Sequence, residues 1–185
     1  DFVEFPSQVN EMWIFWPEVV DNFAVHYQTG ERLPQSIIDA IDNSSTFNQG
    51  HDTSAYLQAA ILDLALHEIH DGYEIEDLIA FEEQAIIDFG LKYSPVPTRY
   101  RSTYFSHIFA GGYSAGYYGY IWSEILDADT VDWFKENGGL TRANGDHFRD
   151  TLLSRGGSID SMQMYRNFRG REATIEPLLK RRGLN

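Results

Sequence analysis

The sequence has 185 residues, 43% of them hydrophobic and 15% aromatic, which is enough apolar material for a buried core. Its 28 acidic and 14 basic side chains give a formal net charge of −14, and this charge repels phosphate backbones and anionic lipid surfaces. Because cysteine is absent, disulfides and thiolate metal sites are excluded, and a metal would have to be bound by His, Asp or Glu. Neither nucleic acid nor a membrane is expected as a partner.

The chain opens on Asp1 and passes at once into a dense apolar pattern. No run of about 18 apolar residues and no basic leader with an apolar stretch is present. We therefore expect a piece of a longer protein, and cytoplasm and periplasm both stay open as its location.

The first predicted element covers residues 6–27, where apolar side chains lie on nearly every face of a helix, as is typical of a buried helix. Pro17 lies inside this element. Because proline lacks an N–H and clashes with the preceding turn, we expect a kink there, or a restart with Pro17 at the first helical position. Helical spacing also predicts helices over residues 35–41, 54–69 and 78–89, with a polar loop over residues 42–50.

The second half of the chain begins with an extended connection imposed by Pro95 and Pro97. A long helix follows and ends at Gly138 and Gly139, and three short helices separated by glycine close the chain. No segment alternates convincingly between polar and apolar residues. The sequence therefore predicts an all-α fold, with residues 1–185 forming a single helical region.

The segment "LHEIHD" superficially matches the zinc-protease signature H-E-x-x-H. That motif needs two histidines four residues apart, so that both imidazoles reach one metal from one helical face. His67 and His70 are only three apart, and they lie at a helix end, where the helix dipole favours histidine. We interpret both as structural.

Acidic side chains on an aromatic helix are a second candidate. Asp1, Glu4 and Glu11 are spaced by three and seven residues, which places them on one face if the helix starts early enough. Carboxylates in apolar surroundings must be paired, protonated or bound to metal. Alternatively, Asp1 and Glu4 cap the helix N-terminus. Both interpretations stay open.

The stretch "HIFAGGYSAGYYGYIW", residues 107–122, holds four tyrosines and four glycines. Tyr113, Tyr117 and Tyr120 recur at i, i+4 and i+7, which predicts three hydroxyls along one helical face. Phenols are neutral donors that can stabilise an oxyanion, and His107 could add another donor. Glycines at this density indicate a mobile lead-in or the close approach of a ligand. The alternative is ordinary core packing.

Two stretches, "DFVEFPSQVNEMW" and "FSHIFAGGYSAGYYGYIWSE", closely resemble the thimet-oligopeptidase-like family of zinc metallopeptidases, in particular its peptidyl-dipeptidase type. The likeness extends to "HYQTGERLP", "GGLTRANGDHFRDTLLSRGGS", "FRGRE" and "RRGLN", and so covers essentially the whole chain. The resemblance implies that Glu4 is the third zinc ligand and that Asp1 orients a zinc-bound imidazole. It further implies substrate binding and oxyanion stabilisation by residues of the second stretch, namely His107, Tyr113 and Tyr120, with Tyr117, Gly111 and Gly112 as further substrate-binding positions.

The family's H-E-x-x-H helix is missing from this sequence. We therefore expect the C-terminal part of a peptidase catalytic domain, with an N-terminal remainder of the same enzyme as its partner. For the complete enzyme the resemblance implies Zn²⁺-assisted hydrolysis of short peptides, most simply with release of C-terminal dipeptides. The alternatives are an oligopeptidase that cuts internally, or an isolated fragment that binds peptides without cleaving them.

Overall fold

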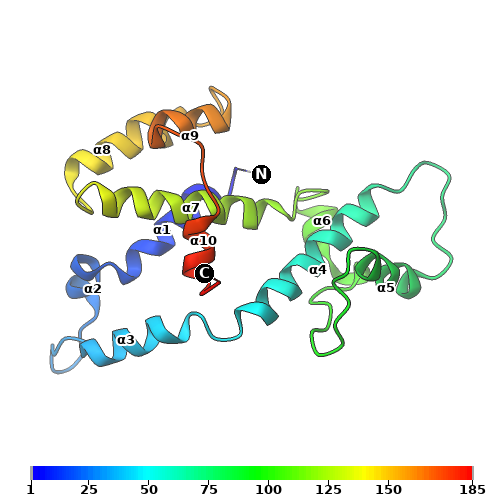
Figure 1. Cartoon of the computed structure of the whole chain (residues 1–185), viewed down its shortest axis with the longest axis horizontal. Coiled ribbons are helices and arrows are strands. Elements are labelled where there is room, and N and C mark those ends of the chain that lie inside the picture. Colours follow the sequence, from blue (N-terminus) through cyan, green and yellow to red (C-terminus); the bar gives the residue numbers. More distant parts are fainter. Residues whose placement is uncertain (1, 185) are drawn as a thin grey trace. The chain divides into compact units, whose positions relative to one another are not determined.

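The computed structural model describes residues 2–184 and divides the chain into two compact units (Figure 1). One unit comprises residues 48–120, and the other joins residues 2–47 to residues 121–184. Within the described residues the chain is helical, and its β structure is confined to an isolated bridge between Val25 and Arg32. The predicted all-α class is confirmed.

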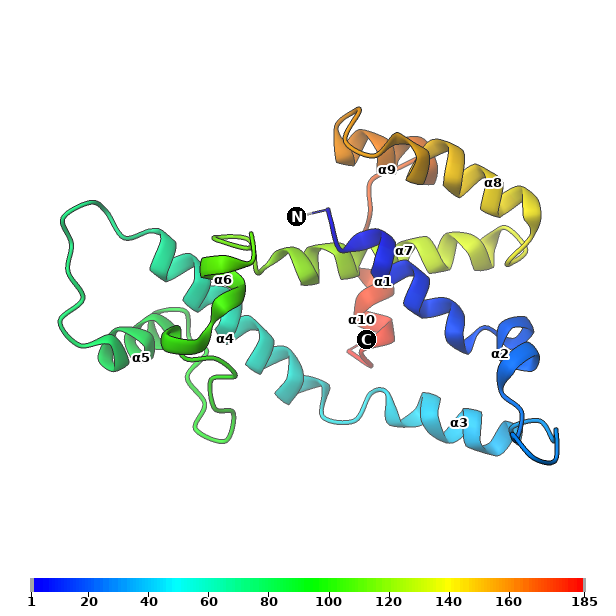
Figure 2. The ribbon, with the colours of Figure 1, turned by 180° about the vertical axis from the view of Figure 1, so that it is seen from behind.

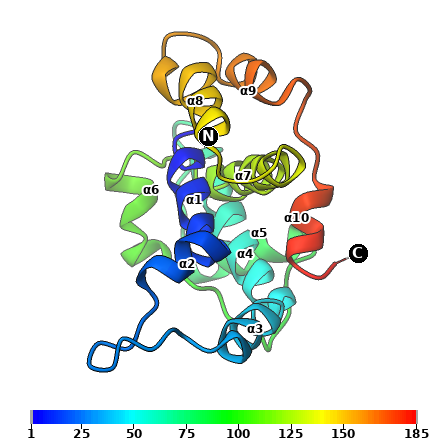
Figure 3. The same ribbon diagram turned by 90° about the vertical axis from the view of Figure 1, so that its left-hand side faces the viewer.

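The larger unit is built around α7, which runs from Gly119 to Glu136 and belongs to this unit from Ile121 onward. Figure 3 looks along α7 and shows α1 and α10 on either side of it, with α8 and α9 across one face. The other helices of this unit are α1 (Phe5–Met12), α2 (Pro17–Phe23), α3 (Gln35–Ser44), α8 (Arg142–Thr151), α9 (Ser161–Arg169) and α10 (Glu176–Arg181).

The core of the larger unit is mostly aromatic. Phe5 of α1 makes edge contacts with Phe148 of α8 and Tyr165 of α9, at ring-centroid distances of 6.4 and 5.9 Å. Such edge-to-face pairs add to the free energy gained by burying the rings. Asp129 of α7 is fully buried, where it accepts a hydrogen bond from Tyr165 and pairs with Arg169 and Arg171. These partners offset the cost of burying its charge and tie α7 to the C-terminal segment.

The smaller unit packs α6 (Ser106–Ala110) against the long helix α4 (Gln49–His67), as Figure 2 shows from behind. Its remaining helix is α5 (Leu78–Asp88), which begins with Asp77 accepting hydrogen bonds from the backbone N–H groups of Ile79 and Ala80. Its core lies between α4 and the segment around α6, and consists of Ala59, Ala60, Leu62, Phe105, Ile108 and Tyr117.

The N-terminal helices lie where the sequence predicts them, but they are less buried than predicted. A 3₁₀ turn, Trp13–Phe15, separates α1 from α2, and Pro17 is the first residue of α2, so the predicted restart is confirmed. Burial on all faces is wrong for the described residues, because Ile14, Phe15 and Phe23 are 48%, 58% and 53% exposed. The predicted loop over residues 42–50 is shorter than expected, since α3 continues to Ser44 and α4 starts at Gln49.

None of the helices in the part of the chain that the structure describes combines the length and apolar character needed to cross a membrane.

Candidate functional site

The tyrosine and glycine stretch folds into a series of turns rather than a helix. After α6 ends at Ala110, residues 111–118 form bends and turns, and α7 begins only at Gly119. Gly112 has φ +80° and Ala115 has φ +51°, and neither value is compatible with a right-handed helix. The prediction that Tyr113, Tyr117 and Tyr120 share one helical face is therefore wrong, since only Tyr120 lies on a helix.

The turns nevertheless bring the predicted residues together in one cluster of rings. Tyr113 stacks on Tyr120 with centroids 5.3 Å apart and ring planes 10° from parallel. The His107 ring lies 6.0 Å from the rings of both Tyr113 and Tyr117, and Tyr117 lies 5.3 Å from Tyr120. We call these four side chains the tyrosine cluster.

Exposure differs sharply within the tyrosine cluster. Tyr117 is only 5% exposed, and burial raises the pKa of its phenol, which keeps it neutral across the physiological range. Tyr113 and Tyr120 are partly buried, and His107 is exposed. The cluster therefore has a buried floor at Tyr117 and an accessible side at His107, Tyr113 and Tyr120.

A depression of about 310 Å³ opens beside the accessible side of the cluster. His107, Gly111 and Tyr113 line it, together with Ser106 and Ala110. A Cβ atom added at Gly111 would lie 2.9 Å from the carbonyl oxygen of His107, closer than real Cβ atoms come to such an oxygen. Gly111 is thus needed for the chain to turn immediately after α6.

Asp63 of α4 was not singled out from the sequence, yet it holds the backbone of the turns. Its carboxylate is fully buried and accepts hydrogen bonds from the N–H groups of Ala115, at 2.9 Å, and Tyr117, at 2.8 Å. Tyr56, also on α4, donates its hydroxyl to the carbonyl oxygen of Tyr117 at 2.6 Å. The available signal was a single acid inside the apolar run "AAILDLALH".

His67 contacts the same aspartate. Its Nδ1 atom lies 2.9 Å from Oδ1 of Asp63 and 2.8 Å from the Asp63 carbonyl oxygen, one helical turn before it. α4 ends at His67, as the sequence indicated, and His70 lies beyond it on the surface. These contacts support a structural role for His67.

Glu4 stands at the N-cap position of α1 and is partly buried. Within the described residues, its carboxylate accepts no capping hydrogen bond from the first turn of α1. Glu11 is exposed, and Asp1 lies outside the described residues. Among residues 2–184, no group of three or more His, Asp or Glu side chains is close enough to hold a metal ion. Glu4 can therefore be at most one member of a larger ligand set.

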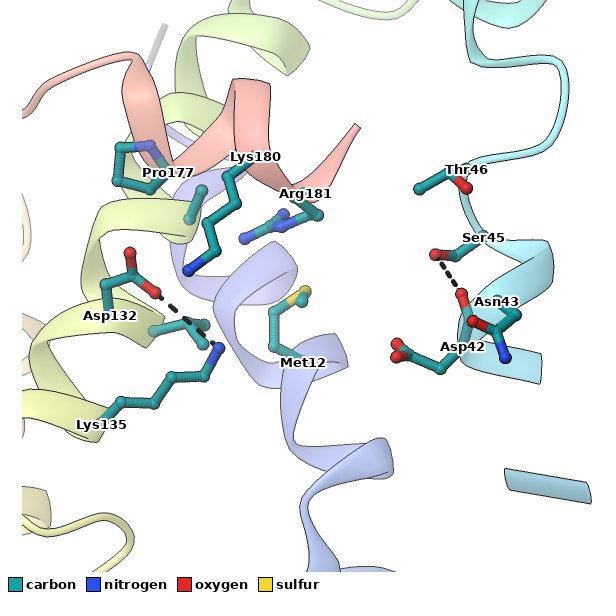
Figure 4. Close-up of a pocket in the computed structure, with 12 residues that line it drawn as sticks. Met12, Asp42, Asn43, Ser45, Thr46, Asp132, Lys135, Pro177, Lys180 and Arg181 are labelled. Atoms are coloured by element: carbon teal, nitrogen blue, oxygen red, sulfur yellow. Dashed lines mark hydrogen bonds and ion pairs between the residues drawn. The ribbon is translucent and has the colours of Figure 1, made fainter. Parts of the chain in front are cut away.

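A separate cavity of about 380 Å³ lies in the larger unit (Figure 4). Lys180 and Arg181 of α10 line it together with Asp132 and Lys135 of α7, and Lys135 forms an ion pair with Asp132 at 3.8 Å. Basic and acidic side chains are mixed in its lining, and it contains none of the residues predicted from the sequence.

The model of peptidase family M3 matches residues 1–184, so the chain belongs to this family of zinc metallopeptidases. The chain is 46% identical to the dipeptidyl carboxypeptidase of Escherichia coli K12, 35% to oligopeptidase A of Salmonella typhimurium LT2 and 32% to saccharolysin of Saccharomyces cerevisiae. In each case the whole chain aligns, but it spans only 26% to 27% of the relative's length. The resemblance read from the sequence is confirmed.

Proposed function

We propose that this chain is part of a zinc-dependent peptidase that hydrolyses short peptides and releases dipeptides from their C-termini. Membership of peptidase family M3 supports the reaction class, and similarity to a dipeptidyl carboxypeptidase over all 185 residues supports the mode of cleavage. Glu4 supplies one zinc ligand, and Asp1 orients a zinc-bound imidazole. The other ligands belong to an N-terminal remainder of the same enzyme, because the described residues hold no ligand cluster of their own.

The observation that carries this proposal is the tyrosine cluster. Peptide hydrolysis builds negative charge on the carbonyl oxygen, and fixed neutral donors stabilise that charge when they are aimed at it. Tyr113 and Tyr120 stack on one another, so their hydroxyls are held on rings with restricted freedom. We assign these two phenols to the oxyanion and His107 to the substrate backbone. Gly111 and Gly112 let the substrate approach the turn closely, and Tyr117 forms the floor.

A second cleavage mode has its own support, since oligopeptidase A relatives are 35% to 36% identical over the whole chain. The experiment compares two peptides of one sequence, one with a free C-terminal carboxylate and one amidated, incubated with the complete protein and zinc. Release of dipeptides from the free acid alone supports the proposal. Equal internal cleavage of both peptides favours an oligopeptidase, and failure to cleave either peptide, with zinc bound, contradicts a peptidase altogether.

A further inference from the structure

We propose that Asp63 is a positioning residue of the peptidase reaction, acting with Tyr56 to hold the turn that carries the tyrosine cluster. The role rests on the proposed function of that cluster. The carboxylate of Asp63 binds the backbone N–H groups of Ala115 and Tyr117 and contacts His67, and none of these contacts is with a ring of the cluster. It would therefore act through the backbone of residues 115–117.

Both polar backbone groups of Tyr117 are bound by side chains of α4. Its N–H donates to Asp63 Oδ2, and its carbonyl accepts from the Tyr56 hydroxyl. Tyr56 and Asp63 are seven residues apart, which places them on one face of the helix, two turns from one another. The Tyr56 ring also stacks on the Tyr117 ring, with centroids 5.5 Å apart. The position of Tyr117 is thus fixed at three points by one rigid element.

The carboxylate also holds a backbone conformation that the sequence does not favour. Ala115 has φ +51°, in the left-handed region that residues with a Cβ rarely adopt. The two N–H groups that bind Asp63 belong to Ala115 and Tyr117, on either side of Gly116, so both point to the same side of the turn. A charged acceptor makes stronger hydrogen bonds than a neutral one, and burial strengthens them further. Asp63 therefore stabilises the turn in which Ala115 is left-handed relative to a turn in which Ala115 has a negative φ.

The turn transmits this constraint to the proposed oxyanion donors. Gly116 donates its N–H to the carbonyl of Tyr113 at 2.8 Å, which closes the turn on the Tyr113 side. On the other side, the Tyr117 ring packs against Tyr120 at the start of α7. Loosening residues 115–117 would free both phenols at once. Small errors in donor placement matter because only correctly aimed donors stabilise a developing charge.

The test uses the complete protein with zinc and the Asp63→Asn variant, which keeps the side-chain size. An asparagine has one acceptor oxygen, and its NH₂ group would face a backbone N–H donor. We expect kcat to fall by about tenfold or more, with KM changed by less than about threefold, because the loss concerns the transition state. Hydrogen exchange at the amides of Ala115 and Tyr117 should accelerate in the same variant.

The matched control is Asp129→Asn, which removes another fully buried carboxylate whose partners are Tyr165, Arg169 and Arg171. This variant should lower stability while leaving kcat and the exchange of the two amides as in the unaltered protein. A purely structural role for Asp63 predicts the same pattern for both variants.

Two further measurements decide the matter if Asp63→Asn does not fold. In the unaltered protein the amides of Ala115 and Tyr117 should be strongly protected, and exchange at the rate of a free peptide would overturn the proposal. Tyr56→Phe, which deletes a single hydroxyl, should also lower kcat, by a smaller factor than Asp63→Asn.

If Asp63→Asn folds, an active enzyme with unchanged kcat would overturn the proposal. An unaltered protein that cleaves no peptide would instead refute the proposed function. The amide exchange would still test whether Asp63 holds the backbone of residues 115–117.

Discussion

At the scale of single residues, the proposed role of the Tyr113 and Tyr120 hydroxyls is to stabilise the transition state rather than to bind the substrate. We expect Tyr120→Phe in the complete protein to lower kcat by about 10²-fold with a smaller change in KM, since the substitution removes a donor to the oxyanion. Ring stacking with Tyr113 should survive, because phenylalanine retains the ring.

Steady-state kinetics with one peptide substrate measure this effect, and Tyr93→Phe is the matched control. Tyr93 belongs to the same unit, is 63% exposed and is not a member of the cluster. Unchanged turnover in Tyr120→Phe would contradict the oxyanion assignment.

Asp127 of α7 is a buried carboxylate, 1% exposed, that lies 2.5 Å from Nη2 of Arg181. Burial raises the pKa of Asp127 to about 6, although Arg181 partly opposes the rise. Because an unfolded aspartate titrates near 3.9, the native state binds the proton more tightly between about pH 4 and 6. Protonation therefore stabilises the fold, and this contribution is lost as pH rises through that window.

Asp127→Asn removes this pH dependence. The stability of the variant relative to the unaltered protein should rise from pH 4 to about pH 6.5, by on the order of 2 kcal/mol, and then level off. Urea unfolding at four pH values across this range measures the difference. A difference that stays flat, or falls with pH, would show that the charged pair with Arg181 outweighs burial.

At the scale of elements, glycine has opposite effects just after α6 and inside α8. At Gly111, a new Cβ would lie 2.9 Å from the His107 carbonyl, so Gly111→Ala must unwind the end of α6 or move the turn. We expect a loss of about 1–3 kcal/mol of stability, together with a fall in kcat because His107 and Tyr113 lie on either side. At Gly145, inside α8, a Cβ meets nothing within 4 Å, and Gly145→Ala should stabilise by about 0.5–1 kcal/mol.

The two alanine variants are controls for one another, since they make the same chemical change in different surroundings. Urea unfolding gives the two free-energy changes, and peptide turnover separates them further, because Gly145→Ala should leave kcat unaltered. Changes of the same sign in stability would contradict the argument from the His107 carbonyl.

Element positions were largely predictable, and the exceptions have a physical reason. Periodicity and Pro17 located α1, α2, α4 and α5 to within a few residues, because apolar spacing and proline act locally. The segment of residues 113–118 was predicted to be helical and forms turns instead. Its left-handed residue is Ala115, which has no local preference for that conformation, and the cause is a carboxylate 52 residues earlier in the chain. A contact at that separation leaves no trace in a local pattern.

At the scale of the whole molecule, the candidate site was predicted by family likeness more than by chemistry. Spacing alone left open both the role of Glu4 and that of the tyrosines, and the resemblance assigned them. The structure adds the hydrogen bonds from Tyr56 and Asp63 of α4 to the backbone of Tyr117, and it adds the exposure of each ring. Both depend on packing between segments distant in sequence. Glu4 belongs to the larger unit, and the four members of the tyrosine cluster belong to residues 48–120.

Zinc retention should depend on the complete ligand set and not on Glu4 alone. One carboxylate cannot hold zinc firmly, because structural and catalytic sites use three or four protein ligands. We therefore expect the 185-residue chain alone to lose zinc on dialysis and the complete protein to retain about one ion per molecule. In the complete protein, Glu4→Ala should lower zinc content measurably after dialysis against a mild chelator, since it removes one ligand of the set.

Glu11→Ala is the matched control, because Glu11 lies seven residues further along the same helix and is exposed. Zinc content by elemental analysis, read beside the circular dichroism of each variant, separates loss of a ligand from loss of the fold. Full zinc content in a folded Glu4→Ala protein would remove Glu4 from the metal site. Equal loss in both variants would point to a general effect of α1 on its surroundings, and Glu4 would then have no more claim to the metal than Glu11.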